Sequence, residues 1–441
     1  MSATLTSRRL PEVTRRFDVW ILACAVTLSV IGIAMVYSTT WGRLVRDGDP
    51  GGYFAIRQTL FVVLGALAAW VVYRLDRPAL MALAAVGYAG SVLGLLAVLT
   101  PLGTTINGTR AWLTLPGGFT LQPAEFAKVF VVLLAALWLS DRQGMRGLND
   151  PPEPQAVLGV LAATGVVAGL LLLQPDLGSA LVTGAAVLGV LFVAGVRRRL
   201  LVGLVVAGAL AAVGAYLLGV LDAYQVARFT AFLDPQADPQ GVGYNVQQAL
   251  IAIGTGGVQG QGLLDGVHTQ GAFVPYQYTD FIFSAVGEEL GMIGGLTVIG
   301  VFVVFLLRGA AAATRADRFG TLLATGIVCW LAAQGFENLG MNLGLLPVTG
   351  VPISGLDADL GDARAMRRMA ADAAPDVALH CAWAIGPDYY DAPANLACVG
   401  GSLGLLQGQG EKGALSRDEK VAEISELLPR IGAAIDDICL I

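Results

Sequence analysis

Three carboxylic acids lie in or at the edge of one apolar stretch, "VPYQYTDFIFSAVGEELGMIGG", which covers residues 274–295. Asp280 is at its entrance, and Glu288 and Glu289 follow about 12 Å deeper if the segment is a helix rising about 1.5 Å per residue. Ionisable side chains inside a membrane segment are costly and indicate function by default. For Glu288 and Glu289, three roles are open: binding a cation, capping another helix, or staying protonated. We predict a structural or tuning role for both and for Glu337.

A second group of polar side chains has the spacing of interacting residues. Glu125 and Lys128, in "LQPAEFAKVF", are three residues apart in a predicted helix and therefore share a face. They either serve a functional site or only neutralise each other within a helix bundle. Arg57 and Gln58 stand at the start of another apolar segment, and Arg110 lies in the predicted loop "NGTRAWLTL".

The elements that carry these residues are membrane helices. Hydrophobic residues make up 55% of the chain and charged residues 14%, whereas a soluble domain has about 25% charged residues. The fold class is therefore an all-α polytopic membrane protein. A large outer loop over 221–279 is expected to hold a short amphipathic helix and a flexible glycine segment. About nine spans of roughly 20 residues are predicted, over 18–38, 58–73, 79–100, 123–140, 155–173, 177–196, 200–220, 280–307 and 319–340.

The arginines predict the orientation of these spans. Basic residues are enriched in cytoplasmic loops. With the N-terminus inside, fourteen arginines fall in inner segments and five in outer segments. Asp280, Glu125, Lys128 and the Arg57–Gln58 pair then lie at one depth near the outer surface. The sequence therefore predicts a site at the outer rim of the membrane.

Several motifs carry a resemblance to a known family. They are "YFAIRQTL", "NGTRAWLTL", "LQPAEFAKV", "LLLQPDLGSAL", "YTDFIFSAVGEELGMIGG" and "NLGMNLGLLPVTGVP". In type and order they resemble the shape, elongation, division and sporulation (SEDS) family over residues 15–352. "GMNLGLLPVTG" is more similar to the RodA-like elongation branch than to the division branch.

The resemblance implies ten membrane helices and a peptidoglycan glycosyltransferase. Its substrate would be lipid II, a disaccharide-pentapeptide on undecaprenyl pyrophosphate, polymerised on the outer face of the bacterial cytoplasmic membrane for elongation and cell shape. The expected partners are a class B penicillin-binding protein and the elongation machinery, with no nucleic acid.

Residue by residue, the resemblance places the family's essential aspartate at Asp280, as the base that takes a proton from the acceptor hydroxyl. Its glutamate and lysine map onto Glu125 and Lys128, and its Arg-Gln pair onto Arg57 and Gln58. The leaving pyrophosphate needs positive charge. Arg57, Lys128, Arg110 or a divalent cation, Mg²⁺ or Mn²⁺, would supply that charge; no other cofactor is expected.

Two departures from the family pattern stand out. Where the family has "LPExH" before TDFIF, this chain has Pro275, Tyr276 and Tyr278. After Pro352, the family's "PFxSYGGSS" loop and tenth helix are replaced by residues 353–441, which hold 14 acidic and 7 basic residues. Part of this tail, 357–407, resembles a fragment of an extended short-chain dehydrogenase or epimerase that lacks its cofactor-binding turn. We predict a membrane domain over 1–352 and an unrelated tail from a fusion or truncation, and we expect this tail to impair the activity.

Two other functions fit the same features. Charged pairs within helices also suit a transporter, here a flippase of lipid-linked precursors. A scaffold without activity is the third alternative, because the last loop and helix of the family are missing.

Overall fold

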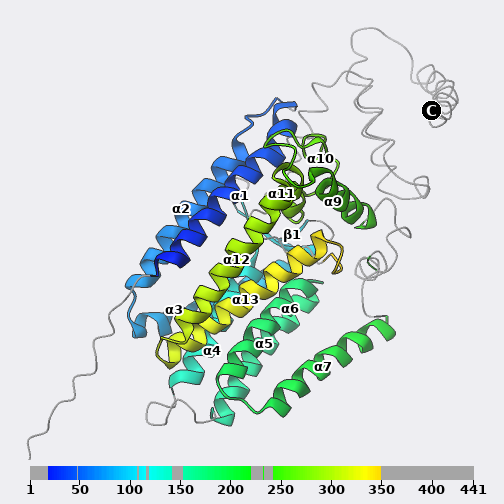
Figure 1. Cartoon of the computed structure of the whole chain (residues 1–441). Coiled ribbons are helices and arrows are strands. Elements are labelled where there is room, and N and C mark those ends of the chain that lie inside the picture. Colours follow the sequence, from blue (N-terminus) through cyan, green and yellow to red (C-terminus); the bar gives the residue numbers. More distant parts are fainter. Residues whose placement is uncertain are drawn as a thin grey trace, which may run out of the picture. The chain divides into compact units, whose positions relative to one another are not determined.

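A computed structural model describes residues 18–46, 48–106, 109–115, 119–141, 152–219, 232 and 242–348. Within these residues the chain is mainly helical, with one small sheet (Figure 1). The predicted tail, 353–441, lies outside the described residues, as does most of the segment 220–241.

Long apolar helices form the body of the described chain. Eight of them are long and apolar enough to cross a membrane, and a ninth, α6, is shorter at 17 residues. Eight of the nine predicted spans each coincide with one of these helices, and the predicted span 280–307 contains most of α12. This agreement confirms the class of polytopic helical membrane protein. The nine are α1 (Val19–Arg46), α2 (Tyr53–Arg74), α3 (Arg77–Leu99), α4 (Pro123–Asp141), α5 (Pro154–Leu173), α6 (Leu177–Val193), α7 (Arg198–Leu217), α12 (Gly291–Ala313) and α13 (Arg318–Asn342).

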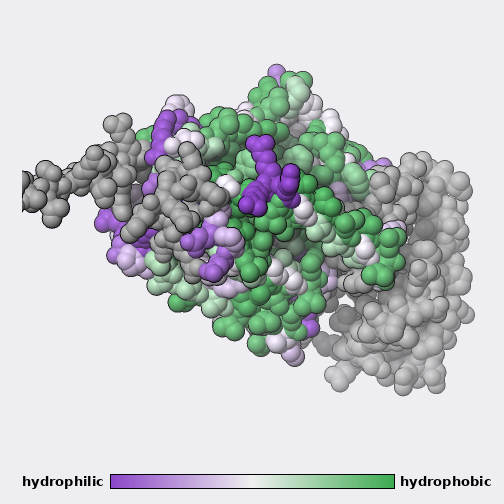
Figure 2. Space-filling view, turned by 90° about the horizontal axis from the view of Figure 1, so that it is seen from below, coloured by the Kyte–Doolittle hydropathy of each residue, from purple (hydrophilic) through white to green (hydrophobic). Residues whose placement is uncertain are grey.

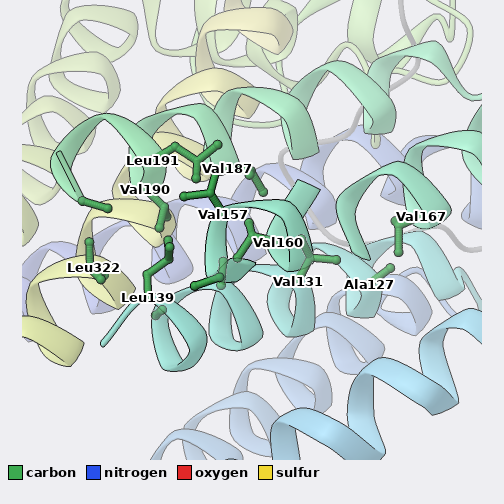
Figure 3. Packing of buried hydrophobic residues seen from close by; sticks show 14 of the residues in the cluster. Ala127, Val131, Leu139, Val157, Val160, Val167, Val187, Val190, Leu191 and Leu322 are labelled. Carbon is green, nitrogen blue, oxygen red and sulfur yellow. The ribbon is translucent and has the colours of Figure 1, made fainter. Parts of the chain in front are cut away.

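Helix α4 is the most buried of the candidate spans. It contacts α3, α5, α6 and α13, and 72% of its apolar window is buried, against 6% for α2 and 0% for α7. Small and aliphatic side chains allow this close approach; the core around α4 includes Ala127, Val131, Leu139, Val157, Val160, Val190 and Leu191 (Figure 3). Apolar residues also cover much of the described surface in Figure 2, as expected of a surface that meets lipid.

A three-stranded antiparallel sheet replaces the loop expected before α4. Its strands are β1 (Gly103–Ile106), β2 (Thr109–Leu115) and β3 (Phe119–Leu121), in the order β1-β2-β3. Arg110 lies in the connection between α3 and α4, as predicted, but within strand β2 of this sheet. The β-branched and aromatic residues of "TRAWLTL" favour this strand.

The predicted span 280–307 is interrupted. It forms α11 (Ile282–Glu289) and α12, which meet at Leu290 and Gly291, and Asp280 precedes the first helical residue. The cause is a backbone contact with the glycine segment 256–262. The amides of Gln261 and Gly262 donate to the carbonyls of Glu288 and Glu289, both at 3.0 Å. The glycine segment is thus docked on the break, and the expectation of a flexible segment is wrong.

The large connection before α11 contains two further described helices, α9 (Val242–Gly256) and α10 (Val267–Gln270). Helix α9 confirms the predicted short helix in "YNVQQALIAIG". It packs against α11 through Ile253, and its Ala249 and Ala252 belong to a buried cluster with Phe281. Helix α9 therefore helps to hold the segment that follows Asp280.

Candidate active site

Asp280 lies in a turn that immediately precedes α11, and it is half-buried. Its amide donates to the Tyr276 carbonyl at 3.1 Å. Its own carbonyl accepts from two side chains of α13, Asn338 Nδ2 at 3.0 Å and Asn342 Nδ2 at 2.9 Å. The backbone of this residue is therefore tied to a helix more than fifty positions further along the chain.

Glu125 and Lys128 form the predicted pair. Lys128 Nζ lies 2.7 Å from Glu125 Oε1; the lysine side chain is fully buried and the glutamate side chain is 37% exposed. Lys128 Nζ also donates to Gln334 Oε1 at 3.3 Å and lies 5.6 Å from the centre of the Trp330 ring. The ammonium group is thus held between α4 and α13 by a carboxylate, an amide and an aromatic face.

Helix α13 connects the two parts of the site. Gln334, Asn338 and Asn342 are spaced four residues apart, so they follow one another along one side of the helix. Gln334 contacts Lys128, whereas the two asparagines contact Asp280. The sequence interpretation missed these three amides. Their signal was present as a regular spacing of three amides, four residues apart, in one predicted membrane helix.

The first turn of α2 reaches the loop before Asp280. The Phe54 and Tyr278 rings are 5.8 Å apart, and a pocket at this junction is lined by Arg43, Phe54 and residues 274–278, among others. Arg57 Nη1 donates to the Tyr53 hydroxyl at 3.2 Å, one turn from Phe54. Gln58 follows Arg57 on the same helix, so both predicted binding residues lie near this junction.

Arg110 has a different environment from the other predicted binding residues. Its Nε donates to the Gly103 carbonyl at 3.2 Å and its Nη2 to the Thr100 carbonyl at 2.6 Å. The guanidinium therefore joins the sheet to the end of α3. These contacts assign Arg110 a structural task in addition to any contact with a ligand.

The buried acids of α11 bind hydrogen-bond donors from other elements. Glu288 accepts from the amides of His268 and Thr269, at 2.6 and 2.9 Å, and from the Thr269 hydroxyl at 2.6 Å. Of the three roles left open for Glu288, the structure shows capping of another helix, α10. Glu289 accepts from the Ser38 hydroxyl of α1 at 2.6 Å. Glu337 is also buried, next to Asn338.

Among the described residues, no group of three or more His, Cys, Asp or Glu side chains could hold a metal ion. Mg²⁺ commonly binds through one or two carboxylates together with substrate phosphates. A single carboxylate such as that of Asp280 is enough for binding of this kind. A divalent cation held jointly by Asp280 and the substrate phosphates therefore remains a proposal.

The fold and these contacts define a polytopic membrane protein with a polar centre built around α4, α11 and α13. The chain belongs to the FtsW/RodA/SpoVE family of cell cycle proteins, the SEDS family, because residues 18–356 match that family's model. The resemblance inferred from the motifs is therefore confirmed.

Curated relatives cover most of the membrane part. The probable peptidoglycan glycosyltransferase FtsW of Geobacter metallireducens is 37% identical over 341 residues, which are 77% of this chain and 88% of the relative. The corresponding FtsW of Nitrosococcus halophilus is 38% identical over 352 residues, 76% of this chain and 86% of the relative.

Solved structures agree with the fold. A chain from a study of polymerization and crosslinking by a peptidoglycan synthase complex has a TM-score of 0.61 and 32% identity, over 77% of this chain and 90% of that one. The rod shape determining protein RodA of Thermus thermophilus has a TM-score of 0.52 and 29% identity, over 77% and 89%.

Proposed function

We propose that this protein is a peptidoglycan glycosyltransferase that polymerises lipid II into glycan strands. Relatives that are 37% and 38% identical over most of their length bear the name of this activity. The observation that carries the proposal is the arrangement around α13, which holds the Lys128 ammonium through Gln334 and the Asp280 turn through Asn338 and Asn342. A base and a cation are the two groups that this reaction needs.

In the proposed reaction, a hydroxyl oxygen of the acceptor sugar attacks the anomeric carbon of the donor. The bond from that carbon to the pyrophosphate oxygen breaks, and the hydroxyl proton passes to the Asp280 carboxylate. Lys128, and Arg57 near the start of α2, stabilise the negative charge that develops on the pyrophosphate. Gln58 orients the ligand, and Glu125 orients the Lys128 side chain. A bound divalent cation would add charge stabilisation at the same oxygens.

We propose that the site faces the outside of the bacterial cytoplasmic membrane, with the N-terminus in the cytoplasm. The excess of arginines in the alternate segments supports this orientation. Lipid II carries its pyrophosphate and sugars at headgroup level, and Asp280 and the start of α4 lie at helix ends. A site at the rim therefore suits such a substrate.

A class B penicillin-binding protein is the proposed partner, with the elongation machinery. A similar chain belongs to a complex that coordinates polymerization and crosslinking, and crosslinking is a second activity that a partner would supply. Elongation is favoured by the motif "GMNLGLLPVTG" and by the structural similarity to a RodA. Division is the alternative, because the similar curated relatives are named FtsW. Expression in cells depleted of either protein would distinguish them by which defect is rescued.

Incubation of the purified full chain with labelled lipid II in vesicles tests the enzymatic proposal. Glycan strands are expected. Movement of lipid II across the bilayer without polymer would instead identify a flippase. Neither product, together with retained binding of a penicillin-binding protein, would identify a scaffold.

A further inference from the structure

The Asp280 carbonyl accepts two side-chain hydrogen bonds from one face of α13, and both donors are deeply buried. Asn338 and Asn342 have no exposed surface, and their Nδ2 atoms lie 3.0 and 2.9 Å from the carbonyl oxygen. A buried amide costs free energy unless it is hydrogen-bonded. Because two buried amides donate to one backbone oxygen, we infer that they fix the position of the Asp280 turn in addition to packing against it.

Asn342 also takes the place of a backbone hydrogen bond. In a regular α-helix continuing through Asp280, the Asp280 carbonyl would accept from the Ser284 amide. Here the Ser284 amide donates to Asn342 Oδ1 at 3.2 Å and to the Phe281 carbonyl at 2.9 Å. The side-chain amide of Asn342 therefore bridges the Asp280 carbonyl and the Ser284 amide. With the amide flipped, its oxygen would face the Asp280 carbonyl and its NH₂ group would face the Ser284 amide, so neither hydrogen bond could form. This bridge explains why α11 begins at Ile282.

The bridge continues into a buried network of side chains. Ser284 Oγ accepts from Gln277 Nε2 at 3.2 Å, and Gln277 Nε2 also donates to Thr269 Oγ1 at 3.0 Å. The Thr269 hydroxyl donates to Glu288 at 2.6 Å. Hydrogen bonds thus connect Asn342 to Glu288 without a gap. Gln277 stands between the two tyrosines that replace the family's acid and histidine.

The turn that receives these bonds has a strained residue. Tyr276 has a φ of +53°, a left-handed conformation that is rare for bulky residues. The amides of Thr279, Asp280 and Phe281 all point to the Tyr276 carbonyl, at 3.1–3.3 Å. Such a conformation persists only where the surroundings hold it, and Asn338 and Asn342 hold its far end.

We propose that Asn338 and Asn342 are positioning residues for Asp280. Their amides fix the backbone turn from which the Asp280 carboxylate reaches the acceptor hydroxyl. This inference rests on the proposed function, in which Asp280 takes the proton. Neither asparagine needs to contact the substrate, so their loss acts on the catalytic step and leaves substrate binding in place.

The test compares Asn342→Leu and Asn338→Leu with a matched control, Thr183→Val. Thr183 is fully buried in α6 and donates to the Ser179 carbonyl at 2.6 Å, so its replacement also removes a buried hydrogen bond. Purified full-length variants are incubated with lipid II in vesicles, and kcat and KM are measured. Backbone amide hydrogen exchange of residues 276–284 is measured on the same samples.

For Asn342→Leu we expect kcat to fall at least about 10-fold with KM within about 2-fold of wild type, and exchange in 276–284 to accelerate. Asn338→Leu keeps the bridge and should show a smaller effect of the same kind. Thr183→Val should change neither. An unchanged kcat, a change in KM alone, or unchanged exchange would overturn the inference. If the wild type makes no glycan, the proposed function fails, and the exchange data alone decide whether the asparagines hold the turn.

Discussion

Lys128 Nζ lies 2.7 Å from Glu125 Oε1, and the lysine is fully buried although the glutamate is 37% exposed. The pair therefore presents its carboxylate outward and its ammonium inward, against Gln334 and Trp330. A substrate phosphate can reach this ammonium only by displacing one of the groups that surround it. In the proposed function, Glu125 thus controls access to Lys128.

This asymmetry predicts strong coupling between Glu125 and Lys128. Glu125→Gln leaves a buried ammonium without its carboxylate, and Lys128→Met removes the ammonium. Breaking a buried pair costs about 3–5 kcal/mol, and the partial exposure of Glu125 favours the lower end, about 3 kcal/mol. A double-mutant cycle on thermal stability and on polymerisation measures the coupling. Strictly additive losses would mean that the two residues act separately.

Gly291 is predicted to be essential to the break between α11 and α12. Its φ is +66°, and a Cβ there would overlap the backbone of Gln259 and Gly260. Gly291→Ala should lower the free energy of unfolding by more than about 2 kcal/mol, because a left-handed alanine alone costs about 1–2 kcal/mol. Gly300→Ala in α12, where a Cβ meets open space, is the control and should be neutral or stabilising. Equal effects of the two would contradict the account of the break.

Asp18 is predicted to give the protein an acid-sensitive tie between α1 and α12. The hydrogen bond from Arg308, at 2.5 Å, lowers the pKa of Asp18 from its ordinary 3.8. Because the pKa of Asp18 is lower in the folded protein than in the unfolded one, the ionised carboxylate stabilises the folded state at pH values above the unfolded-state pKa. This stabilisation is lost as the pH falls through the folded-state pKa. Asp18→Asn should therefore lower Tm at pH 7 and show a smaller further loss on acidification below about pH 4. The same change at exposed Asp49 is the control; a matching profile would refute the tie.

Apolar runs predicted the helices well, because a membrane span must satisfy its backbone internally and carry apolar side chains. The same reasoning could not find the break at Gly291, since hydropathy does not report a backbone contact made by a distant glycine segment. It likewise missed Asn338 and Asn342, which meet Asp280 across 58 and 62 residues. The Glu125–Lys128 pair was predicted because its geometry is local to one helix.

The replacement of the tail tests the interpretation of residues 353–441. We expect that a "PFxSYGGSS" loop and a tenth helix in their place raise both thermal stability and polymerisation. A tenth helix would give its neighbouring helices a packing partner. The exchange would also remove Asp357, Asp359 and Asp362, acids that would repel a pyrophosphate. Both chains should be assayed side by side in the same lipid. Equal activity would mean that the tenth helix is dispensable.

The central claim is that Asp280 takes the proton during glycan polymerisation. The most direct measurement is the rate of glycan synthesis from labelled lipid II by wild type, Asp280→Ala and the control Asp265→Ala, an exposed acid in the same connection. We predict polymer from wild type and the control. For Asp280→Ala we predict none, with the same yield in the membrane and the same Tm. Near-normal glycan synthesis by a folded Asp280→Ala protein would contradict the account.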